Sequence, residues 1–187
     1  VKENGFSHTE SVLFLGWNDA SGEVLREMDN YVKKGSKAHI ICSYAVHLAD
    51  LPKLANIKVS AEVGNITRRS LLDVQKIPTY DHVIVQAEPG QDDQHRDAQV
   101  LVTLLHLRDI ADRQRLGFSI VSEMLDLRNR ELAEATKVDD FIVSEHLVSL
   151  MMSQLSENAE LFDVFADIFD PEGAEIYLKP VGDYVTT

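Results

Sequence analysis

Six short apolar runs alternate with longer segments of helical periodicity, and this alternation constrains the fold more than any other feature. The runs cover residues 11–15, 38–42, 57–61, 82–86, 118–122 and 140–144. Several are too continuously apolar to leave one face in water, which is typical of parallel strands covered on both sides. We therefore predict an α/β fold, a doubly wound, Rossmann-like parallel sheet of six strands with right-handed crossovers.

The segments between these runs carry apolar residues at helical spacing. The pattern between residues 24 and 32 predicts one helix, and the leucine-rich stretch 101–110 predicts a second that should be largely buried. Weaker patterns over 125–135 and 145–155 predict two more. The link between the second and third runs is short and contains Pro52, so we expect only a turn or two of helix there.

Residues 156–170 show a different pattern, in which apolar side chains crowd onto about half of a helix. The turn signal Pro-Glu-Gly follows, and the next stretch alternates like a strand. A helix this aromatic beyond the sixth strand either closes the core or meets another subunit. We therefore predict a first domain over 1–155 and a second element over 156–187. The crowded side chains are Leu161, Phe162, Phe165, Ile168 and Phe169.

Charge and composition exclude several classes of function. The formal charge is −13, from 31 acidic and 18 basic residues, and the sequence has no basic run, so we expect no nucleic-acid partner. Cys42 is the single cysteine, which excludes a disulfide framework and a thiolate zinc site. No window approaches the roughly 18 apolar residues of a membrane span. We therefore expect the chain as given to be soluble. Because the sequence starts at Val1 rather than Met, we also expect it to be a fragment.

The stretch Leu13–Met28 has the order of strand, tight turn and helix that opens dinucleotide-binding domains. Only the first glycine of that motif is present, as Gly16, while Asn18 and Ser21 take the other two positions. Trp17 lies between them, where we expect its ring to sit over the mouth of the site. The second strand supplies no acid for ribose hydroxyls, which argues against ordinary NAD or ATP binding. Either the helix amino end binds an anion such as a smaller nucleotide, or Asn18 caps the helix.

An acidic loop, residues 87–99, follows the fourth apolar run. In a doubly wound sheet this loop borders the crevice where the strand order reverses. Its carboxylates are the oxygen donors that hard cations prefer, and Asp93 and Asp97 share a face if both are helical. We therefore consider a calcium site at Asp92, Asp93 and Asp97, with Glu88 nearby. The alternative is that these carboxylates stabilise a helix amino end.

The sequence carries no recognisable catalytic signature. It has no nucleophile elbow, no phosphate loop with Lys-Ser/Thr, and no His-Glu pair at metalloprotease spacing. We therefore assign no catalytic residue and expect no enzymatic activity. Glu123 ends the fifth predicted strand at the edge of the crevice, where it either contacts a ligand or pairs with Arg128 or Arg130.

Four segments, taken in order, carry a resemblance to a known family. They are LFLGWNDASGEVLREMDNYV (13–32), VGNITRRSLLDV (63–74), DHVIVQAEPGQDDQHRDAQVLVTLLHLRDIADR (81–113) and FSIVSEMLDLRNRELAEATKVDDFIVSEHLVSLMMSQLSEN (118–158). This set resembles the RCK-like (regulator of potassium conductance) cytoplasmic domains of CASTOR/POLLUX-type ion channels, which are related to soluble subunits of Trk and Ktr potassium transporters. Gly64, Asn65 and Thr67 match the family's G-D-A-T turn, with Asn65 in place of the usual Asp.

The resemblance implies an RCK N-lobe over 1–155, with 156–170 as the crossover helix through which such domains pair into homo-oligomers. The tail that follows would begin the C-terminal lobe. The implied function is a ligand-sensing regulatory domain at the cytoplasmic face of a membrane. It would gate a potassium- or calcium-type cation pore in the same parent chain by ligand-dependent rearrangement of paired domains.

Two alternatives remain at this stage: a fragment of an NAD(P)-dependent oxidoreductase, or a soluble potassium-uptake regulator of the Trk/Ktr type. The identity of the ligand stays open between calcium and a nucleotide. The candidate ligand-binding residues are Gly16, Trp17, Asn18, Ser43, Gly64, Asn65, Glu88 and Glu123, and the candidate metal ligands are Asp92, Asp93 and Asp97.

Overall fold

The computed structural model describes residues 9–90, 92–114, 119–129 and 140–170. Its strands form one sheet in the order β3-β2-β1-β4-β5-β6, and every neighbouring pair is parallel. This arrangement confirms the predicted Rossmann-like α/β class. The strands are β1 (Ser11–Leu15), β2 (Ser36–Cys42), β3 (Ile57–Val63), β4 (His82–Val85), β5 (Ser119–Met124) and β6 (Asp140–Val143).

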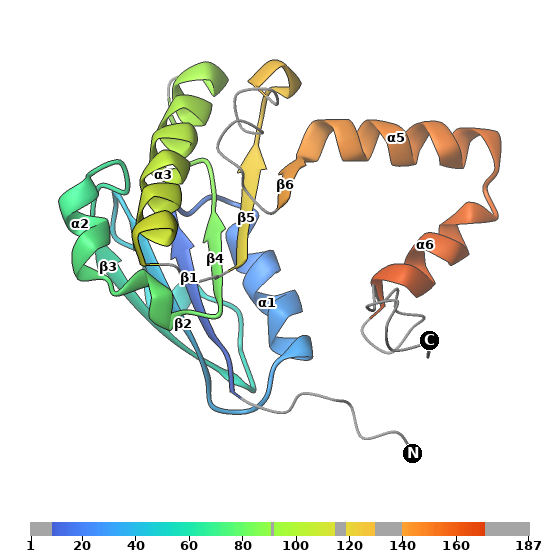
Figure 1. The fold of residues 1–187 in the computed structure, drawn as a ribbon. Coiled ribbons are helices and arrows are strands. Elements are labelled where there is room, and N and C mark those ends of the chain that lie inside the picture. The colour runs from blue at the N-terminus through green and yellow to red at the C-terminus, as the bar shows by residue number, and fades with distance from the viewer. Residues whose placement is uncertain (1–8, 91, 115–118, 130–139, 171–187) are drawn as a thin grey trace, which may run out of the picture. The chain divides into compact units, whose positions relative to one another are not determined.

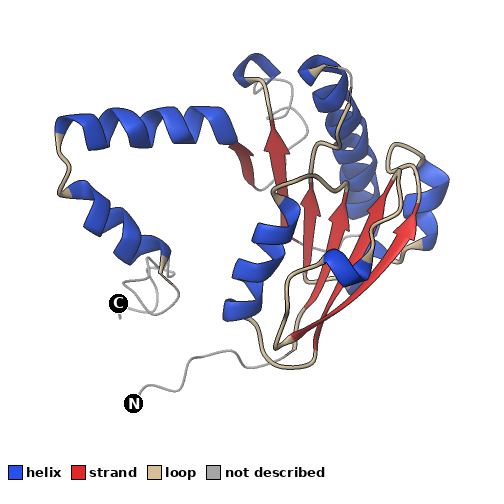
Figure 2. Ribbon diagram, turned by 180° about the vertical axis from the view of Figure 1, so that it is seen from behind, coloured by secondary structure: helices blue, strands red, loops and turns tan. Residues whose placement is uncertain are grey.

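Helices cover both faces of the sheet. Helix α1 (Ser21–Tyr31) lies on one face, and α2 (Arg69–Val74) and α3 (Asp93–Gln114) lie on the other (Figures 1 and 2). The link from β2 to β3 holds a single 3-10 turn, η1 (Leu48–Asp50), as its proline predicted. Further 3-10 turns are η2 (Ile77–Thr79) and η3 (Leu127–Asn129). Most of the helix predicted over 125–135 falls outside the described residues.

Strand β1 is central and buried on both faces, which explains its continuously apolar sequence. Leu13 and Leu15 pack into the cluster formed with α2 and α3, while Phe14 packs into the cluster formed with Leu25 of α1. Burying one such side chain contributes about 1.5–3 kcal/mol. The sheet therefore separates two apolar cores, one beneath each layer of helices.

Helix α3 is buried along the side that packs against the sheet. Val100, Leu104 and Leu107 face the sheet with no exposed surface, whereas Leu105 is 56% exposed and Val102 is 39% exposed. The stretch 101–110 was predicted to be largely buried, and only Val102 and Leu105 within it are exposed. The helix covers one sheet face only, so a stripe on its far side stays in contact with solvent.

The carboxylate of Asp29, at the buried face of α1, holds the entry to β3. It accepts hydrogen bonds from the backbone N–H groups of Ala55 (2.7 Å), Asn56 (2.8 Å) and Ile57 (2.8 Å). Three backbone N–H groups just before and at the start of β3 thereby have hydrogen-bond partners within the protein. These bonds fix the end of the link from β2 to β3 against α1.

The chain divides into two compact units, residues 1–147 and 148–187. Helix α5 (Ser144–Glu157) begins directly after β6 and continues into the second unit, where it is followed by α6 (Leu161–Phe169). Within the described residues, no helix combines the length and apolar character needed to cross a membrane.

Candidate functional site

The turn after β1 requires glycine at position 16. Gly16 has a φ of +88°, and a Cβ atom built there would lie 2.1 Å from the carbonyl oxygen of Gln86 and 3.4 Å from Cγ of Glu88. Only glycine adopts this conformation readily and allows so close an approach of the segment after β4. The first glycine of the motif therefore packs β1 against β4, where the strand order reverses.

Asn18 accepts hydrogen bonds from backbone N–H groups at the amino end of α1. Its Oδ1 accepts the N–H of Ala20 at 3.0 Å, and its backbone carbonyl accepts the N–H of Ser21 at 3.1 Å. Its Nδ2 donates to the carbonyl oxygen of Ala87 at 3.0 Å and to Oε2 of Glu123 at 2.7 Å. Asn18 thus joins the first turn to the ends of β4 and β5. Glu123 at the crevice edge contacts this asparagine.

Glu88 is a buried residue in the loop between β4 and α3, with only 6% of its surface exposed. Its Oε1 accepts the backbone N–H of Ser43 at 2.9 Å, and its Oε2 accepts a short hydrogen bond from the Ser43 hydroxyl. This pair connects the carboxyl end of β2 with the loop after β4, passing over the Gly16 turn.

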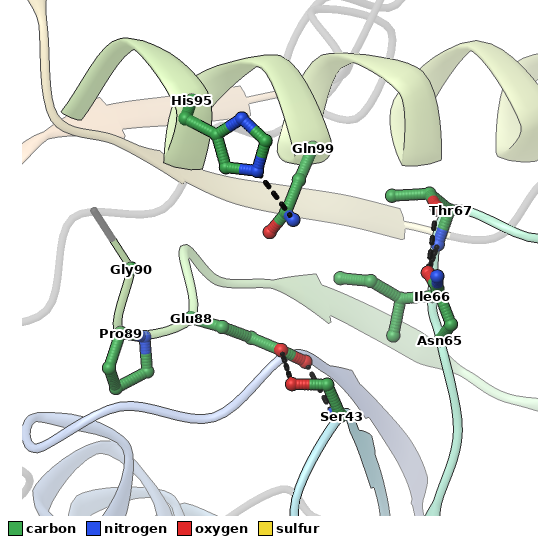
Figure 3. A pocket seen from close by; sticks show the side chains of 9 residues that line it. All are labelled: Ser43, Asn65, Ile66, Thr67, Glu88, Pro89, Gly90, His95 and Gln99. Atoms are coloured by element: carbon green, nitrogen blue, oxygen red, sulfur yellow. Dashed lines mark hydrogen bonds between the residues drawn. The ribbon is translucent and has the colours of Figure 1, made fainter. Parts of the chain in front are cut away.

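A polar hollow of about 290 Å³ opens beside this pair, and we call it the Glu88 hollow (Figure 3). In Figure 3, Glu88 and Ser43 form its floor, and His95 and Gln99 of α3 face them from above. The Nε2 atoms of these two α3 side chains are 3.2 Å apart. The residues that line it are Ser43, Asn65, Ile66, Thr67, Glu88, Pro89, Gly90, His95 and Gln99.

The turn after β3 contributes one wall of the Glu88 hollow. Asn65 Oδ1 accepts both the N–H of Thr67 at 2.9 Å and its hydroxyl at 2.6 Å, which closes an Asx turn. Gly64 is packed so tightly that an added Cβ would lie 2.4 Å from Cδ1 of Leu71. The amide of Asn65 forms this turn without adding a negative charge to the hollow.

A second hollow of about 340 Å³ lies between the start of α1 and the loop after β2. Trp17, which was predicted to cover the mouth of the site, is one of the residues that line this second hollow. It is 8% exposed and packs edge-on against Phe14, with ring centroids 5.6 Å apart. Tyr44 donates its hydroxyl to the carbonyl oxygen of Trp17 at 2.6 Å, and burial raises the pKa of Tyr44 to about 12.

The expected calcium site does not assemble among the described residues, where no group of three His, Cys, Asp or Glu side chains is placed to hold a metal ion. Asp92 accepts the N–H of His95 at 2.8 Å, and Asp93 pairs with Arg96 at 3.3 Å. Asp97 has no exposed surface. Asp92 instead fits the alternative interpretation, that carboxylates of this loop stabilise a helix amino end, because it caps the first turn of α3.

The fold implies a nucleotide at the carboxyl edge of the sheet, but the residues present do not fit a pyrophosphate. The N–H groups of Ala20 and Ser21 that would receive an anion are already satisfied by Asn18. The side chain of Glu88 lies against the Gly16 turn, where a dinucleotide phosphate would approach. A phosphate bound beside this acidic side chain would be repelled by its charge in a site of low dielectric constant.

Sequence reasoning missed the central contact of this site. Ser43 and Glu88 were both named as candidates, but nothing in the sequence indicated that they bind each other across 45 residues. The detectable signal was positional: both residues follow strands whose carboxyl ends meet at one sheet edge.

The strand order, the two helical layers and the turn at Gly16 define a Rossmann-like domain. Solved structures share the fold at low sequence identity. The NAD(P)-binding domain of an exopolyphosphatase-related protein from Archaeoglobus fulgidus matches with a TM-score of 0.56 and 15% identity, covering 80% of this chain and 99% of that one. The GsuK RCK domain matches with a TM-score of 0.55 and 15% identity, covering 81% and 29%. The TrkA-N domain of YbaL from Escherichia coli matches with a TM-score of 0.54 and 9% identity, covering 80% and 98%.

Curated relatives are ion channels of plants. The chain is 27% identical to ion channel DMI1 of Medicago truncatula over 217 residues, which covers 95% of this chain and 25% of the channel. It is 26% identical to ion channel POLLUX of Lotus japonicus, covering 95% and 24%, and 24% identical to ion channel CASTOR of the same plant, covering 94% and 25%. No family model matches the chain. The predicted resemblance to CASTOR/POLLUX-type channels is confirmed, and the chain spans about a quarter of the length of these relatives.

Proposed function

We propose that this chain is a regulatory, non-enzymatic domain of a cation channel. A ligand at the carboxyl edge of its sheet favours one arrangement of paired domains, and that arrangement biases a membrane pore in the same parent chain. A ligand can shift such an equilibrium only by binding one arrangement better than the other. The domain therefore needs two features, a ligand site and a surface for pairing.

The observation that carries this proposal is the extent of the match to the channels. The similarity runs over 95% of this chain but only 25% of DMI1, so the chain corresponds to one segment of a much larger channel. That segment has the fold seen in the GsuK RCK domain. The remaining three quarters of such a channel leave room for a pore. Relatives named as channels favour this proposal over a free-standing potassium-uptake regulator.

The pairing surface is proposed on α6. This helix exposes 63% of Phe162, 59% of Phe169 and 37% of Ile168 within the described residues. Large apolar side chains exposed together on one short helix are a feature of interaction sites. A second copy of the chain would remove these side chains from water, with about 25 cal/mol gained per Å² of apolar surface buried.

The pairing surface is tested with Phe162→Asp, using Val74→Asp as the matched control. Val74 is 72% exposed but belongs to α2 in the first unit. We expect wild type and Val74→Asp to show the mass of an oligomer by light scattering, and Phe162→Asp to dissociate at the same concentration. Equal masses for all three proteins would remove α6 from the proposal.

Channel regulation is tested on the full-length parent protein in planar bilayers. We expect cation currents whose open probability changes in Phe162→Asp while the conductance of a single channel does not, because the substitution lies outside any pore. A parent protein that conducts no cations would contradict the proposal. So would a Phe162→Asp variant that dissociates yet leaves gating unchanged.

The proposal assigns no reaction to the chain. A dehydrogenase of this fold requires a dinucleotide at the Gly16 turn, and the Glu88 carboxylate and the Asn18 contacts do not fit one. We therefore expect no hydride transfer when the protein is supplied with NAD(H) or NADP(H) and a panel of alcohols and aldehydes.

A further inference from the structure

We infer that the Glu88 hollow binds the protonated amino group of a small organic amine. This inference rests on the proposed function, since it names the class of ligand that a regulatory domain of this kind would sense. It is carried by a buried carboxylate whose charge no cationic side chain neutralises within the described residues, and by the character of the groups around it.

The carboxylate of Glu88 is nine-tenths buried, yet its hydrogen-bond partners in the described part of the chain are only the N–H and hydroxyl of Ser43. No Lys, Arg or His of the described residues lies within ion-pair distance of it. A carboxylate accepts about four hydrogen bonds, so half of its capacity is left for the hollow. Burying a charge without a partner is costly, and a bound cation removes that cost.

Arg96 of α3 contacts the main chain of the loop after β4, and its guanidinium is not paired with the Glu88 carboxylate. Its Nε donates to the backbone carbonyl of Glu88 at 2.7 Å and its Nη2 to that of Ala87 at 3.5 Å. Its Nη1 pairs with Asp93 at 3.3 Å. The arginine therefore holds the main chain of the β4 loop in place and leaves the Glu88 carboxylate to a ligand.

The remaining polar groups of the hollow suit a donor. The hydroxyl of Thr67 donates its proton to Asn65, so its oxygen can only accept from a ligand. The Gln99 side chain faces Glu88 across the hollow (Figure 3), and its amide oxygen is a further acceptor. An ammonium group carries three donors and one positive charge, which matches one carboxylate and two neutral oxygens.

Two other ligand classes fit this hollow less well. A phosphate would meet the Glu88 carboxylate in a poorly solvated site and would be repelled. A divalent metal ion needs several charged ligands, and the hollow supplies one carboxylate. The volume of about 290 Å³ also exceeds what a bare ion fills and suits a molecule of several non-hydrogen atoms.

The test is calorimetric titration of the chain at pH 8, where ordinary amines are protonated and imidazoles are largely neutral. The probes are putrescine and ethanolamine as hydrochlorides, with inorganic phosphate and calcium chloride at matched ionic strength. We expect saturable binding of at least one amine and none of phosphate. Heat from phosphate or calcium alone would overturn the inference.

Three variants locate the bound amine. Glu88→Gln keeps the shape and the Ser43 contacts but removes the charge, and we expect it to weaken amine binding at least about tenfold, because charge-assisted hydrogen bonds are the stronger class. Ser43→Ala keeps the charge and frees one lone pair of Glu88, so amine binding should persist or tighten. Asp93→Asn removes an exposed charge of the same sign and should change the affinity by less than about twofold.

Equal amine affinity in wild type and Glu88→Gln would overturn the inference even if the amine binds. Loss of binding in all three variants would overturn it as well. Binding would then depend on the overall negative charge of the protein and not on a site at Glu88. Failure here is separable from failure of the proposed function. A chain that pairs through α6 and gates a channel, yet binds no amine, loses only this ligand class.

Discussion

The carboxylate of Asp97 and the backbone N–H of Leu125 are joined at 2.9 Å, although 28 residues separate them. The second carboxylate oxygen accepts the N–H of Asp126 at 2.9 Å and Nδ2 of Asn129 at 2.8 Å. A side chain that sequence reasoning assigned to a cation instead holds the turn after β5 against the first turns of α3. Asp97 was named as a candidate metal ligand because Asp93 and Asp97 are four residues apart and share a face of the helix.

Asp97→Asn should therefore destabilise the fold. The amide replaces one acceptor oxygen with a donor that faces backbone N–H groups, so we expect a loss of about 2–4 kcal/mol in the free energy of unfolding. Urea denaturation measures it. Asp93→Asn, whose side chain is 62% exposed, is the matched control and should stay within about 0.5 kcal/mol of wild type. Similar stability for the two variants, with calcium stabilising only the wild type, would restore the metal interpretation.

Gly16 and Gly22 should respond to alanine in opposite directions. Gly16→Ala places a Cβ 2.1 Å from the carbonyl oxygen of Gln86 at a φ of +88°, so we expect a loss of more than about 3 kcal/mol or no folding at all. Gly22 lies in α1, where the new Cβ would be 3.9 Å from Cδ of Pro52. Because alanine favours helix, Gly22→Ala should gain up to about 0.5–1 kcal/mol. A Gly16→Ala protein as stable as wild type would refute the close approach of β1 and β4.

Tyr44 should make stability fall between pH 10 and 12. Its pKa is about 12 in the folded chain, mainly through burial, against an ordinary value of 10. The folded state therefore favours the neutral phenol. That contribution is fully present below pH 10 and disappears as the pH rises toward 12. This contribution is isolated by urea denaturation of wild type and Tyr44→Phe at pH 8 and pH 11. The difference in the free energy of unfolding between the two proteins should be smaller at pH 11. A constant difference would mean that Tyr44 titrates normally.

Local patterns in the sequence determined most of the sheet. Apolar runs such as Val12–Leu15 report burial on both faces directly, so the strands were placed within a few residues of their observed ends. The first residues of β2 and the last residues of β3 were not predicted as strand. These ends are extended by pairing with a neighbouring strand and not by apolar content: Ser36 pairs with Ile57, and Cys42 pairs with Val63. The edge strand tolerates exposed residues that a periodicity rule counts as loop.

The side chains that organise the carboxyl edge could not be assigned in the same way. Asp29, Glu88 and Asp97 are all buried carboxylates, and each accepts backbone N–H groups from a segment 26 to 45 residues away. A carboxylate in a polar stretch of sequence is on average a solvated residue. Whether such a carboxylate is buried depends on which backbone N–H groups the folded chain brings to it. Those groups are distant in sequence, so a local sequence pattern does not indicate them.

The amide of Asn18 reaches both Ala87 and Glu123 from a turn that also starts α1. Three segments of the first unit that are distant in sequence are thereby fastened at one point. A displacement of the ends of β4 or β5 must therefore either break these hydrogen bonds or move the first turn of α1 as well. Under the proposed function, the contacts of Asn18 are the route by which a ligand bound at the carboxyl edge of the sheet would act on α1.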